Sequence, residues 1–153
     1  MSYEQLLIEA HNNDMIVKEV NFESSSKGLI KNNKIAIRMD TPTAVEKACI
    51  LAEELGHYFT SHGNILDQTK IINIKQEKRA RNWAYEKLVP LHKLIRAYEA
   101  GVSNRFELAL YLDVIEEFLE CAIEHYREKY GLYSIKGNYI IYFEPLGVYK
   151  SVD

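Results

Sequence analysis

The chain contains 153 residues, of which 47% are hydrophobic and 27% charged, a balance typical of a compact globular protein. A formal net charge of −3 and the lack of a long basic run give no general attraction to phosphate backbones, which disfavours nucleic acid as a partner. Glu4 and Glu9 stand where a signal peptide would be positively charged, and no uncharged apolar run reaches membrane-spanning length, so we expect a cytoplasmic protein.

The first part of the chain is expected to form a short helix and three strands. Leu6, Leu7 and Ala10 have helical spacing, and the polar run Asn12-Asn-Asp14 ends that helix as a turn. Lys31-Asn-Asn33 is typical of a hairpin turn because asparagine tolerates positive φ. The expected helix covers 3–10, and the expected strands cover 15–22, 28–30 and 34–38.

Two longer helices are expected next. Thr43 and Glu46 have the spacing of a capping box, which predicts a helix from Thr43 to about Thr60. A second helix is predicted from 75 to 89, where Pro90 closes it. The remaining expected elements are helices over 92–100, 105–111 and 114–130, and a β-hairpin that turns at 136–138.

The cysteines and the scattered histidines are not expected to carry chemistry. Cys49 and Cys121 lie in apolar helical contexts without a CxxC partner, so we expect two buried thiols and neither a disulfide nor a metal pair. His11, His92 and His125 lie in unrelated segments, which favours surface or packing roles.

The stretch LAEELGH at 51–57 holds a candidate metal site on the first long helix. Positions four apart lie about 40° apart around a helix and about 6 Å along it, so Glu53 and His57 can bind one ion from one face. In metal hydrolases of the H-E-x-x-H kind, the middle glutamate accepts a proton from the attacking water, and Glu54 stands at that position. Two glutamates and one histidine also suit an ordinary solvated face, so this stretch alone leaves both interpretations open.

The next helix carries a spaced set of residues that resembles the second-helix signature of the ImmA/IrrE family of metallo-endopeptidases. In that family a glutamate ligand is followed by alanine at +3, an aromatic-alanine pair at +6 and +7, leucine at +11 and proline at +13. The matching residues here are Glu77, Ala80, Trp83, Ala84, Leu88 and Pro90. Together with ELGH at 54–57 and the strands before it, the resemblance covers about 15–90.

The resemblance implies both a fold and a set of site residues. For the part that it covers, the implied fold is a small N-terminal three-stranded sheet packed on a zincin-like helical core. With the C-terminal helices and the terminal β-hairpin that the residue pattern predicts, the expected class is α+β. We expect a metallopeptidase domain, 1–90, and an extension, 91–153, packed as one unit with it. Glu54 is the implied general base, His57 and Glu77 are implied ligands of a divalent metal, and Glu53 replaces the family's first histidine.

Two departures from the family pattern change the expected metal chemistry. Glu53 adds a negative charge that weakens the ion's pull on bound water, and Arg81, where the family usually has asparagine, can restore positive potential. Arg81 also suits an ordinary exposed position. Zinc is the expected ion, and the harder ions Mn²⁺ and Fe²⁺ also suit a carboxylate-rich set. His62 and Asp67 are the substitute ligands if Glu53 does not bind.

Three functions are compatible with these residues. The resemblance implies a cytoplasmic hydrolase that cleaves a partner protein, such as a DNA-binding repressor of a prophage or another mobile element. The exchange at Glu53 keeps open a non-catalytic metal-binding or protein-binding regulator, although Glu54 is retained. A helix-turn-helix DNA-binding protein is the third interpretation, for the segment that starts at Asn104. Phosphates would repel the glutamates of its second helix, which are Glu116, Glu117, Glu120 and Glu124.

Overall fold

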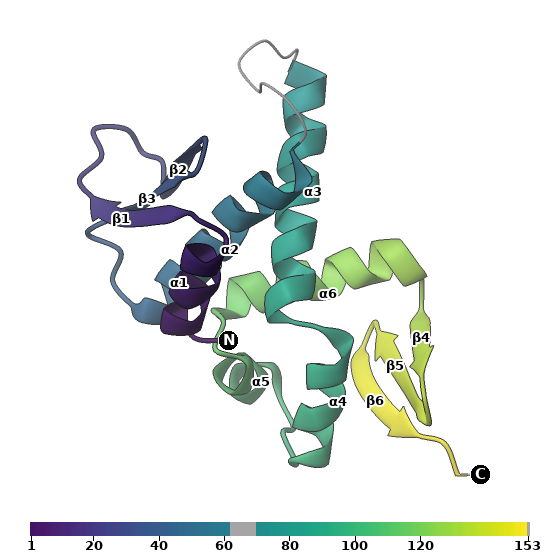
Figure 1. The fold of residues 1–153 in the computed structure, drawn as a ribbon. Coiled ribbons are helices and arrows are strands. Elements are labelled where there is room, and N and C mark those ends of the chain that lie inside the picture. Colours follow the sequence, from purple (N-terminus) through teal and green to yellow (C-terminus); the bar gives the residue numbers. More distant parts are fainter. Residues whose placement is uncertain (62–69, 153) are drawn as a thin grey trace. The chain divides into compact units, whose positions relative to one another are not determined.

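The computed structural model describes residues 1–61 and 70–152 and confirms the predicted α+β class (Figure 1). The chain forms two compact units, Met1–Ala84 and Tyr85–Asp153, and the boundary falls inside one long helix. Within the described part of the chain, no helix is both long and apolar enough to cross a membrane.

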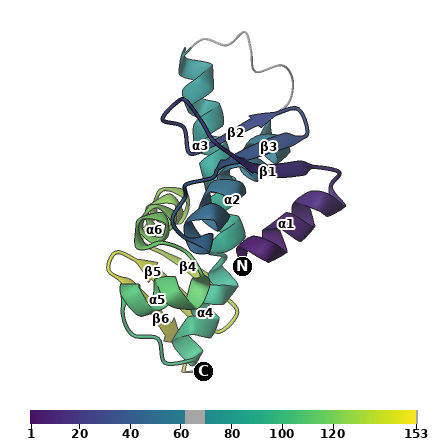
Figure 2. The same ribbon diagram turned by 90° about the vertical axis from the view of Figure 1, so that its left-hand side faces the viewer.

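The first unit begins with a helix and a small mixed sheet. Helix α1 (Tyr3–Asn12) starts with a capping box between Ser2 and Gln5, which satisfies two backbone N–H groups that the first turn leaves unpaired. The predicted sheet is present with the order β1-β3-β2 (Figure 2). Strand β1 (Ile16–Val20) runs parallel to β3 (Lys34–Arg38), and β2 (Gly28–Lys31) pairs with β3 as the predicted antiparallel hairpin.

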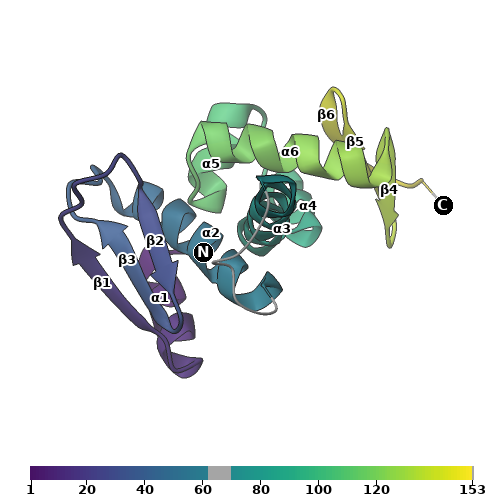
Figure 3. The same ribbon diagram turned by 90° about the horizontal axis from the view of Figure 1, so that it is seen from above.

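Helices α1 and α2 cover one face of this sheet (Figure 3). Ile35 and Ile37 of β3 are almost fully buried on that face. Helix α2 (Ala44–Thr60) starts where the sequence predicted, because the Thr43 hydroxyl accepts a hydrogen bond from the backbone N–H of Glu46. Its buried stripe includes Leu51 and Leu55, which are both fully buried. The helix thus buries an apolar face while its LAEELGH stretch remains partly accessible.

Helix α3 (Lys70–Leu88) starts earlier than the predicted residue 75, since no glycine or proline interrupts the preceding residues. It ends just before Pro90, as predicted, because proline offers no N–H to continue the helix. The α2–α3 connection, 62–69, lies outside the described residues, and so do the candidate ligands His62 and Asp67.

The second unit contains three helices and an antiparallel sheet. The helices are α4 (Leu91–Glu99), α5 (Arg105–Leu112) and α6 (Glu116–Tyr130). The predicted hairpin is formed by β4 (Tyr133–Lys136) and β5 (Tyr139–Phe143), and a third strand, β6 (Leu146–Lys150), pairs with β5. Strand β6 follows the turn at Glu144-Pro145. The sequence pattern predicted only the hairpin and did not separate this third strand from it.

A polar cluster lies beside the core of this second unit. The Tyr126 hydroxyl donates to the carbonyl oxygen of Val89 at 2.7 Å. His125 is buried, which agrees with the predicted packing role. Its Nε2 lies 3.2 Å from Glu86 Oε2. The other carboxylate oxygen, Glu86 Oε1, lies 2.8 Å from Lys129 Nζ. Charge-assisted contacts of this kind satisfy polar groups that the fold removes from water.

The prediction of two buried thiols is only half right. Cys49 is buried in α2, but Cys121 is exposed on α6, and the two form no disulfide. The reason is helical phase: Phe118, Leu119 and Ala122 share the buried stripe of α6, and position 121 falls outside it.

Candidate active site

Helices α2 and α3 approach each other very closely at Gly56. A Cβ atom built on Gly56 would lie 2.9 Å from the carbonyl carbon of Ala80 and still closer to its carbonyl oxygen, distances that real Cβ atoms do not show. The rings of Phe59 and Trp83 stack with centroids 5.2 Å apart a turn further along the same helix pair. Glycine in the ELGH stretch therefore has a packing function, since only a residue without a side chain admits the Ala80 backbone.

This close approach brings together two of the predicted site residues. His57, the next residue on α2, places its Nε2 3.2 Å from Oε1 of Glu77 on α3. The second carboxylate oxygen of Glu77 lies 3.9 Å from Nη2 of Arg81, one turn further along α3. The His57 side chain is only 16% exposed, whereas Glu77 is half exposed. Two donor groups from separate helices thus converge at a site that solvent can reach.

Glu54, the predicted base, lies between α2 and the sheet. A Cβ atom on Gly28 of β2 would be 2.9 Å from Glu54 Oε1, so the carboxylate lies directly against the glycine backbone. Burial, followed by the negative charges of Glu53 and Glu77, raises the pKa of Glu54 to about 7. The negative charges of Glu53 and Glu77 therefore both act on the Glu54 carboxyl group. A cation bound nearby would lower the pKa of Glu54 and so oppose them.

Glu53, the third predicted ligand, is half-buried on α2, one turn before His57. Its negative charge is one of the causes that raise the pKa of Glu54. Across residues 1–61 and 70–152, no set of three or more His, Cys, Asp or Glu side chains is arranged to hold a metal ion. The donor types nevertheless fit a divalent metal, because an imidazole nitrogen and carboxylate oxygens are ordinary ligands of zinc.

Strand β2 has a free edge next to Glu54. Within the described residues β2 is the last strand of its sheet, so only one of its sides pairs with β3. The backbone N–H of Arg38 donates to the carbonyl oxygen of Lys27 at 3.0 Å, which makes Lys27 and Arg38 a hydrogen-bonded pair. Because such pairs alternate along an antiparallel ladder, the N–H and C=O of Gly28, the next residue, point toward the free edge.

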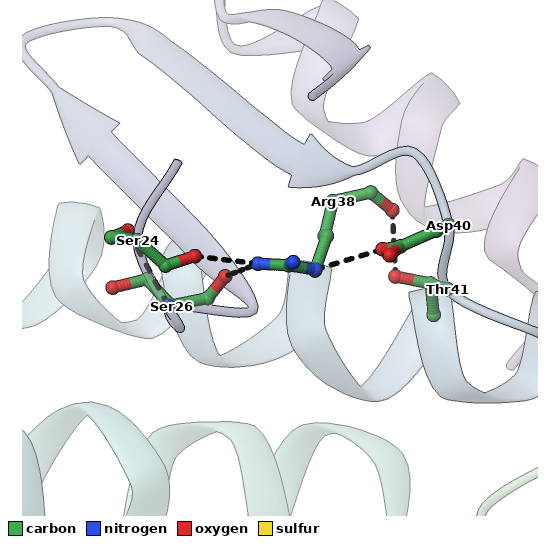
Figure 4. A network of polar contacts seen from close by, with 5 residues as sticks. All are labelled: Ser24, Ser26, Arg38, Asp40 and Thr41. Carbon is green, nitrogen blue, oxygen red and sulfur yellow. Dashed lines mark hydrogen bonds and ion pairs between the residues drawn. The ribbon is translucent and has the colours of Figure 1, made fainter. Parts of the chain in front are cut away.

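Arg38 also holds the loop that leads into β2 (Figure 4). Its Nη1 donates to the carbonyl oxygens of Ser24 at 2.7 Å and Ser26 at 3.3 Å, and its Nε lies 2.8 Å from Asp40 Oδ1. The Thr41 hydroxyl donates to the Arg38 carbonyl at 2.6 Å. One guanidinium therefore joins the loop before β2 to the turn after β3, using several donors of its fixed planar fork.

Two glycines that shape this site, Gly28 and Gly56, are not recognisable as site residues from the sequence. Gly56 was part of the quoted motif, and an isolated glycine in a helical pattern is a recognised signal of close packing. Gly28 was assigned only as the start of a strand, where glycine can mark a close approach. The partner atoms, on α2 and α3, could not be inferred from either signal.

Comparison with known proteins gives one match. The model of the family described as Peptidase_M78, IrrE N-terminal-like domain, matches residues 3–124, which include both helices of the site and the N-terminal sheet. The last part of α6 and strands β4 to β6 lie beyond the matched range. No curated protein and no solved structure matches the chain significantly. Since the match covers most of the chain, the protein belongs to the Peptidase_M78 family, with an IrrE N-terminal-like domain.

Proposed function

We propose that this protein is a metal-dependent endopeptidase that uses Glu54 as general base and Glu53, His57 and Glu77 as metal ligands. The observation that carries the proposal is the 3.2 Å approach of His57 to Glu77 from two helices, beside a half-buried carboxylate, in a chain of a peptidase family. Zinc is the first candidate ion, with Mn²⁺ and Fe²⁺ as alternatives, because the proposed set contains two carboxylates and one imidazole.

The proposed roles follow from the chemistry of each group. A bound divalent ion would polarise the scissile carbonyl and acidify the attacking water. Glu54 would accept the proton of that water and later deliver it to the leaving amine, as a general base beside a metal-bound water does. Arg81 would orient Glu77 through its contact with the outer carboxylate oxygen, as outer partners of metal ligands commonly do.

We further propose that the substrate is a protein segment bound in extended form. The free edge of β2 offers the N–H and C=O of Gly28 beside Glu54, and an added strand can pair with such groups. Pairing of this kind binds the substrate through backbone hydrogen bonds, so it depends little on the amino-acid sequence of the substrate. The family resemblance supports a DNA-binding repressor as the partner, in the cytoplasm, cleaved in a flexible segment.

The test is Glu54→Gln, which keeps the side-chain volume but cannot accept a proton. Purified protein is loaded with zinc and incubated with the candidate repressor, and fragments are identified by mass spectrometry. We expect cleavage to fall by about 10²–10⁴, with zinc content and melting temperature unchanged. Glu46→Gln on the first turn of the same helix is the matched control and should cleave normally. Undiminished cleavage by Glu54→Gln would refute the assigned base.

The second candidate is a non-catalytic regulator that retains the fold. It is favoured by Glu53, which stands where the family resemblance expects a histidine ligand. Such a protein would bind its partner without hydrolysing it at any zinc or manganese concentration. Stable co-elution of intact partner and protein on gel filtration, without fragments after prolonged incubation, would identify this function.

A further inference from the structure

We propose that Gly28 is a positioning residue for Glu54, because its missing side chain provides the space that the Glu54 carboxylate occupies. The inference rests on the proposed role of Glu54 as general base. It concerns a residue on the sheet, outside the two helices that carry the proposed ligands.

The distances at Gly28 show that this space is already filled. A Cβ atom there would lie 2.9 Å from Glu54 Oε1 and 3.1 Å from Glu54 Cγ, and 2.8 Å from Cγ2 of Ile50. These values are at or inside the closest distances that Cβ atoms adopt. The backbone at Gly28 is not left-handed, unlike that at Gly101, Gly131 and Gly137. Glycine is therefore required at position 28 for space and not for its backbone conformation.

The groups around Gly28 differ in how easily they can move. Ile50 and Glu54 lie one turn apart on α2, and a β-branched isoleucine has one strongly preferred rotamer in a helix. Strand β2 is paired with β3, whose Ile35 and Ile37 are buried, and Arg38 ties down the preceding loop. The Glu54 side chain is the most adjustable neighbour, so an added methyl group would displace its carboxylate.

Such a displacement predicts a selective kinetic defect. A misplacement of about 1 Å at a reacting group can cost about a hundredfold in rate, so Gly28→Ala should lower kcat by about that factor. Metal affinity should not change, because the three atoms nearest to the added Cβ belong to Ile50 and Glu54 and to none of the proposed metal ligands. KM should change little, since alanine keeps the backbone N–H and C=O that face the free edge.

The experiment is a double-mutant cycle between Gly28→Ala and Glu54→Asp in the full chain. Aspartate is shorter by one methylene, so it withdraws the carboxylate oxygen that the new methyl group would meet at 2.9 Å, while the contact with Ile50 is the same in both backgrounds. We measure kcat and KM, zinc affinity by calorimetry, and the urea midpoint of the metal-free protein. The matched control is Gly147→Ala, at a strand glycine without positive φ, where the three atoms nearest to the added Cβ all belong to the exposed Tyr149 side chain.

We expect a smaller loss of stability from Gly28→Ala in the Glu54→Asp background than in the wild type, and no further loss of kcat there. Equal stability losses in the two backgrounds, or an unchanged kcat for Gly28→Ala, would overturn the inference. If Gly28→Ala does not fold, recovery of folding by Glu54→Asp supports the inference and lack of recovery overturns it. If the wild type binds zinc but hydrolyses nothing, the proposed function fails, while the stability cycle still decides whether Gly28 makes room for Glu54.

Discussion

Substitution of Gly56 by alanine is predicted to destabilise the protein and to separate the two helices of the site. In an ordinary helix position, glycine to alanine stabilises by about 1 kcal/mol. At Gly56 the new Cβ would lie 2.9 Å from the carbonyl carbon of Ala80, whereas non-bonded carbon atoms prefer about 3.5–4.0 Å. The helices would therefore have to move apart by roughly 1 Å, since the Ala80 carbonyl oxygen is closer still and both atoms belong to a backbone.

The expected free-energy change combines two opposite effects. Overpacking of a closely fitted interior costs about 1–3 kcal/mol, and more where side chains cannot yield. The gain in helix propensity offsets about 1 kcal/mol of that cost. Because the atoms that are struck belong to a backbone, we use the upper end of the overpacking range and expect a net loss of about 2 kcal/mol. Since about 1 kcal/mol shifts the melting temperature of a protein of roughly 150 residues by 2–4 °C, the expected decrease is about 4–8 °C.

Urea denaturation and thermal melting of the metal-free protein measure this change. Ala80→Gly in the Gly56→Ala background should not restore stability, because the contact involves the Ala80 carbonyl and not its side chain. Zinc affinity should also fall, since His57 and Glu77 are brought within 3.2 Å by the same helix pair. A Gly56→Ala variant as stable as the wild type, or more stable, would refute the close approach of α2 and α3.

Three further predictions concern individual carboxylates. Glu77→Ala should lower the zinc affinity, measured by calorimetry. The loss should exceed about 10- to 100-fold, which is typical when a residue that only hydrogen-bonds a metal ligand is mutated. Unchanged affinity would remove Glu77 from the ligand set. Glu53→Ala should lower zinc content and cleavage, whereas Glu53→His should retain zinc and cleave from a lower pH, because neutral imidazole leaves more charge on the ion; full zinc content in Glu53→Ala would contradict this. Burial raises the pKa of Glu86, but hydrogen bonds from Lys129 and His125 outweigh it and lower the pKa below the ordinary 4.5. Ionised Glu86 therefore stabilises the fold above pH 4.5, and this contribution is lost as the pH falls through the lowered pKa. The difference in free energy of unfolding between wild type and Glu86→Gln, measured by urea denaturation, should therefore vanish in acid.

Much of the fold was predictable because the signals were local. The hydroxyl of Thr43 caps α2, Lys31 and Lys34 flank the predicted hairpin turn, and Pro90 follows the end of α3 closely, each as expected from residues within a few positions. The spacing of Glu53 and His57 on one helix is equally local, as it depends only on the helical repeat. These properties are decided by backbone dihedral preferences and by hydrogen bonds between near neighbours.

Errors arose where exposure or pairing depended on distant parts of the chain. Cys121 has an apolar sequence context but faces solvent, because burial on α6 depends on which stripe the rest of its unit covers. Strand β6 was not separated from the preceding hairpin, since a strand's existence depends on a partner with which it can pair.

The sequence by itself determined most of the elements, among them the helix that carries Glu53, Glu54 and His57, and it carried the family resemblance. Only the tertiary structure decided that Glu77 reaches His57 and that Gly28 lies against Glu54. The physical reason is that these contacts join segments far apart in sequence, whose approach is set by packing between α2, α3 and the sheet. That packing depends on the absence of side-chain atoms at Gly28 and Gly56. Which atoms fill the space beside a glycine is decided only when the chain has folded.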